Sequence, residues 1–188
     1  REIEMQLRFS GSTSLATVAF VSLIVLSVLL SPVFGASSDA AGNIIFILDA
    51  SGSMKAQAQG KVKMDVAKEA LSGLIRDLPA GVKVGLVVYG HRQKDDCEDV
   101  EELTPLGALN KDELIQKING INPKGKTPIT YSVRKVAEGL QAIEEAATIV
   151  LVSDGEETCK ADPCVAVTEL RESGIKFVMH VIGFDVAE

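Results

Sequence analysis

Oxygen-bearing side chains follow two apolar runs of this chain, in an arrangement that suits a divalent metal ion. One group comes directly after the apolar run 44–48, a hydroxyl lies in the segment 125–129, and a carboxylate comes shortly after the apolar run 148–152. The residues concerned are Asp49, Ser51, Ser53, Thr127 and Asp154. Carboxylate and hydroxyl oxygens are hard ligands, so the set favours Mg²⁺ over zinc, with Mn²⁺ or Ca²⁺ as alternatives.

The elements that must position these residues alternate between strands and helices. Strands are predicted at 44–49, 82–89, 100–106, 148–153 and 177–184. The alternation predicts an α/β fold, an open doubly wound sheet that is mostly parallel, with helices on both faces. The connection between the second and third strands holds no helix, which predicts one antiparallel edge strand. Asp49 and Asp154 should then meet where ligands bind in such sheets, at the carboxyl ends of the strands.

Four helices are predicted between these strands. The first spans 61–78 and should bury one face, made of Ala67, Ala70, Leu71, Leu74, Ile75 and Leu78. Asn110 and Glu113 indicate the start of the second, by a capping-box pattern. The third is expected to begin at Pro128, with Thr127 as its cap, and the fourth at Pro163, with Asp162 as its cap.

The motif Asp49-x-Ser51-x-Ser53, followed by Thr127 and Asp154, resembles the metal-ion-dependent adhesion site of von Willebrand factor type A (VWA) domains. The likeness runs from about Gly42 to the C-terminus and includes the strand 84–90. The segments 89–92, 123–129 and 157–159 resemble a bacterial secreted branch of that family. The resemblance implies a Rossmann-like sheet with strand order 3-2-1-4-5 and a sixth strand beyond. Residues 43–188 are therefore expected to be a C-terminally truncated VWA domain that lacks its last edge strand.

The resemblance also implies a role for each residue of the motif. Ser51 and Ser53 would ligate the cation directly, and Thr127 would do so in the binding-competent state. Asp49 and Asp154 would hold the ion through water. A remaining coordination position would accept a Glu or Asp carboxylate of a protein partner. Lys55 and Lys126 flank the motif and are expected to be ordinary surface lysines.

The N-terminal region indicates export. No charged residue occurs between Arg8 and Asp39, and residues 15–30 are almost wholly apolar. This length lies between a signal-peptide core and a membrane-spanning helix, so residues 1–35 are expected to be a signal peptide or an N-terminal membrane anchor, with 36–42 as a linker. An extracytoplasmic domain follows, periplasmic or secreted, with membrane association through residues 15–30 if they are retained. The formal net charge of −7 and the lack of a basic patch exclude a nucleic-acid partner.

The chain has three cysteines, which in an oxidising compartment predicts one disulfide and one free thiol. Cys159 and Cys164 are close in sequence and are the favoured pair. The rival pair is Cys97 with Cys159, since both should lie near one end of the sheet.

An exported module that captures an acidic residue through a bound cation is therefore the leading prediction, and an enzyme is not expected. One alternative is Mg²⁺-dependent phosphoryl transfer with Asp49 as nucleophile, as in phosphatases of the haloacid-dehalogenase type. Those enzymes carry a second aspartate two positions on for acid–base work, and here that position is Ser51. The other alternative is an accessory subunit of a membrane transport or channel complex, because proteins associated with calcium-activated channels carry similar domains.

Overall fold

The computed structural model describes residues 42–143 and 146–184. The predicted signal peptide or anchor, and all but the last residue of the predicted linker, lie outside these residues. Within the described part of the chain, no helix is long and apolar enough to cross a membrane.

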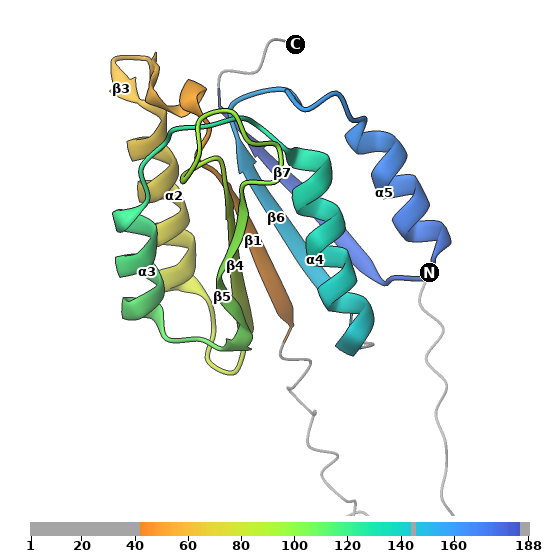
Figure 1. Cartoon of the computed structure of the whole chain (residues 1–188). Coiled ribbons are helices and arrows are strands. Elements are labelled where there is room, and N and C mark those ends of the chain that lie inside the picture. Colours follow the sequence, from red (N-terminus) through yellow and green to blue (C-terminus); the bar gives the residue numbers. More distant parts are fainter. Residues whose placement is uncertain (1–41, 144–145, 185–188) are drawn as a thin grey trace, which may run out of the picture. The chain divides into compact units, whose positions relative to one another are not determined.

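A five-stranded sheet forms the centre of the domain, in the order β5-β4-β1-β6-β7 (Figure 1). Its strands are β1 (Asn43–Asp49), β4 (Lys83–Tyr89), β5 (Val100–Ala108), β6 (Ala147–Ser153) and β7 (Phe177–Gly183). Neighbouring strands run parallel except for β4 and β5, which are antiparallel. The predicted fold class and strand order are confirmed. A separate two-stranded sheet joins β2 (Gln57–Ala58) to β3 (Lys61–Val62).

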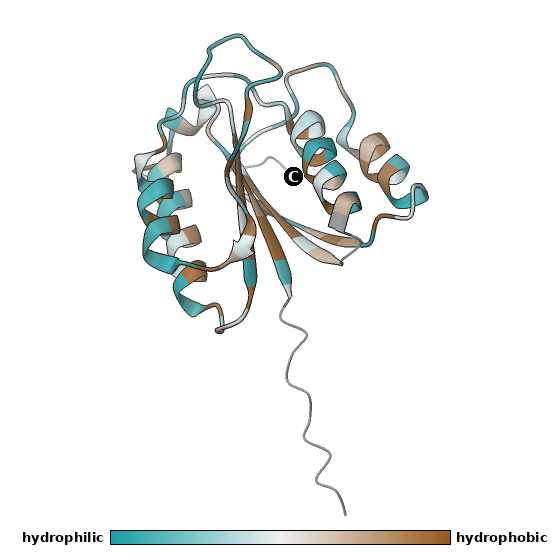
Figure 2. Ribbon diagram, turned by 60° about the horizontal axis from the view of Figure 1, so that its bottom comes forward, coloured by the Kyte–Doolittle hydropathy of each residue, from teal (hydrophilic) through white to brown (hydrophobic). Residues whose placement is uncertain are grey.

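Helices cover both faces of the sheet. The helices α2 (Lys63–Asp77) and α3 (Lys111–Gly120) lie on one face, and α4 (Ile129–Ile143) and α5 (Pro163–Glu172) lie on the other (Figure 1). A short 3₁₀ helix, η1 (Gly52–Lys55), follows β1. Figure 2 shows hydrophobic strands between helices whose hydrophilic residues lie mainly on their outer sides.

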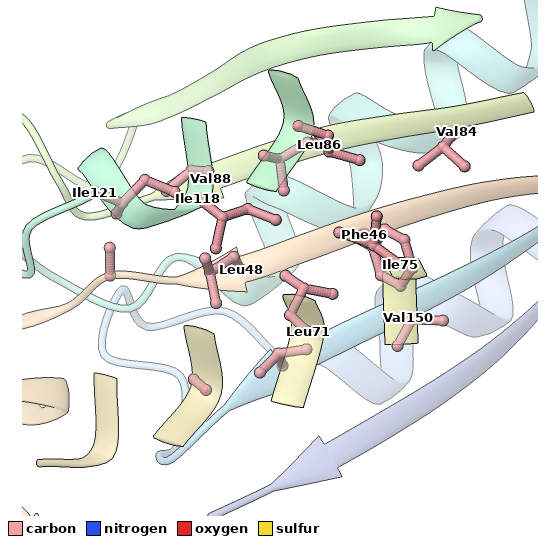
Figure 3. Packing of buried hydrophobic residues seen from close by; sticks show 14 of the residues in the cluster. Phe46, Leu48, Leu71, Ile75, Val84, Leu86, Val88, Ile118, Ile121 and Val150 are labelled. Atoms are coloured by element: carbon pink, nitrogen blue, oxygen red, sulfur yellow. The ribbon is translucent and has the colours of Figure 1, made fainter. Parts of the chain in front are cut away.

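The central strand β1 is buried on both faces because parallel strands are covered on both sides. Phe46 and Leu48 point into the cluster formed with α2 and α3, and Figure 3 shows them with Leu71 and Ile75. Ile45 and Ile47 point into the second cluster, with α4. Both Phe46 and Leu48 are 0 % exposed, so the end of β1, where Asp49 lies, is firmly held.

The predicted buried face of α2 is partly wrong. Ala67, Leu71 and Ile75 are buried, but Ala70 is exposed and Leu74 is 41 % exposed. Met64 joins the buried residues instead. The stripe follows the spacing 64, 67, 71, 75, and Ala70 lies roughly 100° around the helix axis from its centre.

The predicted caps are confirmed at α3 and α5. The side chain of Asn110 accepts a hydrogen bond from the Glu113 amide at 3.3 Å. Asp162 Oδ1 accepts from the Cys164 amide at 2.8 Å, and Pro163 is the first residue of α5. Both helices therefore start where the sequence places them.

The predicted start of α4 is wrong. The helix begins at Ile129, and the Pro128 carbonyl accepts the first helical hydrogen bond, from the Ser132 amide at 3.0 Å. Glu157, from the loop after β6, accepts a hydrogen bond from the Thr130 amide at 2.8 Å. Within residues 42–143 and 146–184, the Thr127 hydroxyl has no hydrogen-bonding partner, so a distant carboxylate satisfies this helix end instead of a local hydroxyl.

Candidate metal centre

The carboxyl ends of β1 and β6 bring the predicted site residues to one edge of the sheet. The two strands are parallel neighbours, with Leu48 opposite Val152. Asp49 is the last residue of β1, and Asp154 directly follows the end of β6. Ser51 and Ser53 lie in the turn and the short 3₁₀ helix after β1. The order of the strands therefore determines which polar residues meet.

Three of the five predicted residues form a continuous chain of oxygen atoms. The hydroxyls of Ser51 and Ser53 lie 2.9 Å apart. The Ser53 hydroxyl donates to Asp154 Oδ1 at 2.8 Å. Ser53 is exposed, whereas Ser51 and Asp154 are buried, so this chain of oxygens reaches the surface at its middle member.

The Asp49 carboxylate is fully buried and orients the loop that follows it. Its Oδ1 accepts a hydrogen bond from the Ser51 amide at 2.7 Å, and its Oδ2 accepts one from the Ser153 hydroxyl at 2.6 Å. Burial raises the pKa of Asp49 above its ordinary value, and the hydrogen bonds from Ser153 and Ser51 act in the opposite direction. Tyr89 donates in turn to the Ser153 hydroxyl at 3.2 Å. The sequence pattern did not single out Ser153, although it is the last residue of a predicted strand.

Thr127 reaches the same edge of the sheet through backbone pairing of its loop. Ser51 and Gly125 form an isolated parallel bridge, and the Gly52 amide donates to the Gly125 carbonyl at 2.8 Å. Gly90 lies beneath this contact with a positive φ of 69°. A Cβ on Gly90 would overlap the Lys126 carbonyl oxygen, so only glycine permits the approach. Thr127 itself is buried, at 4 % exposure.

The segment 157–159 holds Thr127 from the other side. The Thr127 amide donates to the Thr158 hydroxyl at 2.8 Å, and the Thr158 amide donates to the Thr127 carbonyl at 3.2 Å. The same segment carries Glu157, whose other carboxylate oxygen accepts from the Cys159 amide at 2.8 Å. The sequence did not indicate these contacts. They fix the backbone of Thr127 and leave its hydroxyl unengaged by the described residues.

The predicted disulfide pairing is wrong, and the rival pairing is the one present. Cys97 is bonded to Cys159, across 62 positions of the sequence, and Cys164 is a free, exposed thiol. Cys164 lies in the first turn of α5, where the Asp162 cap engages its amide. The loop between β4 and β5 carries Cys97 to the edge of the sheet where Cys159 lies. The disulfide therefore anchors the segment 157–159 that holds Thr127.

A buried lysine completes the centre. Lys63 is the first residue of α2, and its ammonium donates to Asp154 Oδ2 at 3.1 Å. The side chains of Lys63 and Asp154 are 10 % and 1 % exposed. The sequence analysis considered only Lys55 and Lys126 as lysines near the motif, and Lys55 is exposed, as expected of a surface lysine. Lys63 was missed because only the packing of α2 against the sheet brings it to Asp154.

The donor set at this edge fits a hard divalent cation. Among residues 42–143 and 146–184, no cluster of three or more His, Cys, Asp or Glu side chains is placed to hold a metal ion. The predicted site supplies two carboxylates, and its other donors are hydroxyls. Hydroxyl oxygens are hard but uncharged, and they suit Mg²⁺, Mn²⁺ or Ca²⁺ better than soft metals.

The fold and this edge of the sheet define a known class of domain. A family model described as "von Willebrand factor type A domain" matches residues 44–157, and the chain belongs to this family. Two proteins of Bacillus subtilis (strain 168) are similar to it along most of their length. The protein YwmC is 30 % identical over 185 residues, covering 89 % of this chain and 81 % of its own. The protein YwmD is 27 % identical over 180 residues, covering 91 % and 80 %. Both are described as uncharacterized.

Solved structures share the fold at low sequence identity. A von Willebrand factor type A protein from Catenulispora acidiphila matches with a TM-score of 0.59 and 21 % identity, covering 76 % of this chain and 33 % of that one. Proximal thread matrix protein 1 of the mussel byssus, with a zinc-occupied MIDAS motif, matches with a TM-score of 0.57 and 19 % identity, covering 76 % and 37 %. The pilus adhesin SpaC of Lactobacillus rhamnosus GG matches with a TM-score of 0.62 and 14 % identity, covering 78 % of this chain and 25 % of that one. This chain thus spans between a quarter and just over a third of those proteins.

Proposed function

We propose that this chain is a metal-dependent protein-binding module. Ser51, Ser53 and Thr127 would hold a divalent cation, Mg²⁺ in the first instance, with Asp49 and Asp154 orienting them. The partner would be a protein that presents a Glu or Asp carboxylate. The observation that carries the proposal is the continuous oxygen chain Ser51–Ser53–Asp154, which joins the ends of β1 and β6 and reaches the surface at Ser53.

The side chains of the site have separate tasks in this proposal. Asp49, buried and bonded to the Ser51 amide, fixes the direction of the loop that carries both serines. Asp154 fixes the Ser53 hydroxyl through Oδ1. A bound cation supplies a Lewis-acidic position for one further anionic oxygen. Because the hydroxyls that would ligate the cation directly are uncharged, these ligands do not neutralise it, and a carboxylate from outside the chain is favoured there.

The surroundings of Asp49 argue against phosphoryl transfer. A carboxylate nucleophile must reach its substrate, but Asp49 is 0 % exposed and both of its oxygens accept hydrogen bonds. Ser51, two positions on, is a poor proton donor near neutral pH, so it does not replace the acid of those enzymes. We therefore propose a binding function and no turnover.

Other observations support a role outside the cytoplasm. The disulfide between Cys97 and Cys159 is of a kind that persists in oxidising compartments. The apolar segment 15–30 is consistent with a signal peptide or anchor. One protein of similar fold is a pilus adhesin and another is a byssus matrix protein.

Calorimetry with the full chain tests the proposal. We expect Mg²⁺ or Mn²⁺ to bind at one site in the parent chain and not in Ser53→Ala. The exposed Asp77→Ala, at the end of α2, serves as a control that should bind as the parent does. Partner capture from the cell envelope should require Mg²⁺ and be abolished by a chelator. Hydrolysis of an activated phosphate ester that disappears in Asp49→Asn would contradict the proposal.

A further inference from the structure

The buried Lys63 ammonium lies beside the proposed cation site and is not part of its predicted donor set. The backbone fixes its position, because the Lys63 amide donates to the Ala56 carbonyl at 2.9 Å where α2 begins. From there its side chain reaches Asp154 Oδ2 at 3.1 Å. The side chain of Lys63 is 10 % exposed and that of Asp154 is 1 % exposed. Water therefore screens this ion pair far less than it screens a pair on the surface.

Asp154 is shared between Lys63 and the hydroxyl chain. Its Oδ1 accepts the hydrogen bond from Ser53, and its Oδ2 accepts the one from Lys63. Lys63 therefore occupies one oxygen of the carboxylate and leaves the other directed at the serines. It holds the orientation of Asp154 and also places a positive charge within hydrogen-bond reach of the centre.

The charges of the centre show what this lysine changes. Asp49 and Asp154, when ionised, bring two negative charges, and Lys63 offsets one of them. A divalent cation would then leave one positive charge in excess, which one partner carboxylate neutralises. Without Lys63, the same cation would be balanced by the two aspartates alone. The attraction for the cation would be stronger and the attraction for an outside anion weaker, because Coulomb interactions are strong at such short separations in a partly dry site.

We propose that Lys63 sets the balance between cation affinity and anion affinity at this centre. It weakens retention of the divalent ion and strengthens capture of a partner's carboxylate. This inference rests on the proposed function and assigns to Lys63 a positioning and specificity-determining role within it.

The test compares Lys63→Met with Lys63→Arg in the full chain. Methionine keeps much of the apolar length and removes the charge, whereas arginine keeps the charge. Mg²⁺ affinity is measured by calorimetry. Affinity for acetate, as a carboxylate probe, is measured on Mn²⁺-loaded protein by water-proton relaxation. Lys61→Met is the matched control, because Lys61 is exposed and its replacement removes the same charge close to the site.

Lys63→Met is expected to bind Mg²⁺ roughly tenfold more tightly and acetate several-fold more weakly. The Mg²⁺ and acetate affinities of Lys63→Arg and Lys61→Met should stay near those of the parent. Without metal, the melting temperature of Lys63→Met should be lower than that of the parent, because Asp154 loses the buried lysine ammonium. The rise in melting temperature on adding Mg²⁺ should be larger in Lys63→Met than in the parent. Lys63→Gln, which keeps a hydrogen-bond donor, replaces the methionine variant if that variant does not fold.

Two results separate the failure of this inference from the failure of the proposed function. If the parent chain binds neither Mg²⁺ nor Mn²⁺, the proposed function is wrong and the inference with it. If the parent binds Mg²⁺ but the folded Lys63→Met or Lys63→Gln chain binds it equally or more weakly, only the inference is overturned. In that second case Lys63 acts as a structural partner of Asp154.

Discussion

The Ser53 hydroxyl donates to Asp154 Oδ1 at 2.8 Å, although the two residues are 101 positions apart in the sequence. The contact depends on the parallel register of β1 and β6, which sets Leu48 opposite Val152 and so brings the two strand ends level. A shift of one residue in that register would turn every side chain of one strand to the other face. The geometry of the proposed cation site is therefore a consequence of how the core of the sheet packs.

Asp49→Asn should abolish Mg²⁺ binding without unfolding the chain. Asparagine keeps the volume of the buried side chain and one acceptor for the Ser51 amide, but it removes the negative charge. The free energy of unfolding without metal should change by no more than about 2 kcal/mol, since relief of the buried charge offsets part of the lost hydrogen bonding. Calorimetry and urea unfolding measure the two quantities, and Asp77→Asn is the exposed control. Equal Mg²⁺ affinity in Asp49→Asn and parent would reject Asp49 as part of the site.

The buried Asp99 should make stability depend on pH. It accepts hydrogen bonds from the Arg92 amide at 2.8 Å, from the Gln93 amide at 2.9 Å and from Arg92 Nε at 2.6 Å. Burial alone would raise the pKa of Asp99, but these hydrogen bonds together outweigh it and hold the pKa below its ordinary value. Its stabilisation is therefore fully present above the unfolded pKa of about 3.9 and is lost as the pH falls through the lower folded pKa.

Asp99→Asn is expected to lower the free energy of unfolding at pH 7 by about 1–3 kcal/mol. The difference in the free energy of unfolding between Asp99→Asn and the parent should become smaller once the pH falls below about 4. Urea unfolding at a series of pH values measures it, and the exposed Asp95→Asn in the same loop should show little effect at any pH. A difference that stays constant down to pH 2 would show that the charge of Asp99 plays no part.

The disulfide between Cys97 and Cys159 should support both stability and the position of Thr127. Replacing both cysteines by serine is expected to lower the free energy of unfolding by about 2–5 kcal/mol. Carboxylate capture should weaken more than Mg²⁺ binding, because the released segment 157–159 holds Thr127 and not the serines. Thermal unfolding and the calorimetric titrations measure these effects, with Cys164→Ser as the control. Peptide mapping without reductant that links Cys164 to either other cysteine would reject this pairing.

Most of the sheet could be predicted from the sequence because β1, β4, β6 and β7 are mainly apolar runs bounded by polar loops, whereas the edge strand β5 is of mixed polarity. The strand order came from the resemblance to a family, since pairing between distant strands leaves no local signal. Asp49 and Asp154 could be placed at one edge of the sheet because they follow two strands expected to be neighbours. Each hydroxyl of the motif taken alone is an ordinary turn or cap residue. Only their joint occurrence indicated a site.

The missed features all depend on tertiary contacts. Lys63 looks like an exposed helix residue until α2 is packed over the end of β6. Glu157 caps a helix that begins 28 positions earlier, at Ile129, and no rule of local sequence predicts that. Nearness in sequence favoured Cys164 as the partner of Cys159, whereas the loop between β4 and β5 brings Cys97 to it. In each case the contact joins residues that are far apart in the sequence, because loops from the whole domain meet at this edge of the sheet.

Thr127→Ala should separate carboxylate capture from cation binding. The expected capping role of Thr127 would have confounded this variant, because loss of a cap lowers stability by about 1 kcal/mol. The structure removes that difficulty, since Glu157 bonds to the first turn of α4 and the contacts of Thr127 to Thr158 involve its backbone. The free energy of unfolding should therefore fall by only about 1 kcal/mol or less, from the buried methyl and hydroxyl groups.

Acetate affinity of the Mn²⁺-loaded protein is expected to fall at least about tenfold in Thr127→Ala, which corresponds to 1.4 kcal/mol, while Mg²⁺ affinity falls less. The reason is that Thr127 would ligate the cation mainly in the partner-bound arrangement, whereas Ser51 and Ser53 ligate it throughout. Thr127→Ser keeps the hydroxyl and should restore acetate binding. Glu157→Gln is the control for the helix end, because it perturbs the cap of α4 and leaves the Thr127 hydroxyl in place. Equal losses of acetate and Mg²⁺ affinity in Thr127→Ala would show that Thr127 belongs to the resident cation site and has no separate part in capture.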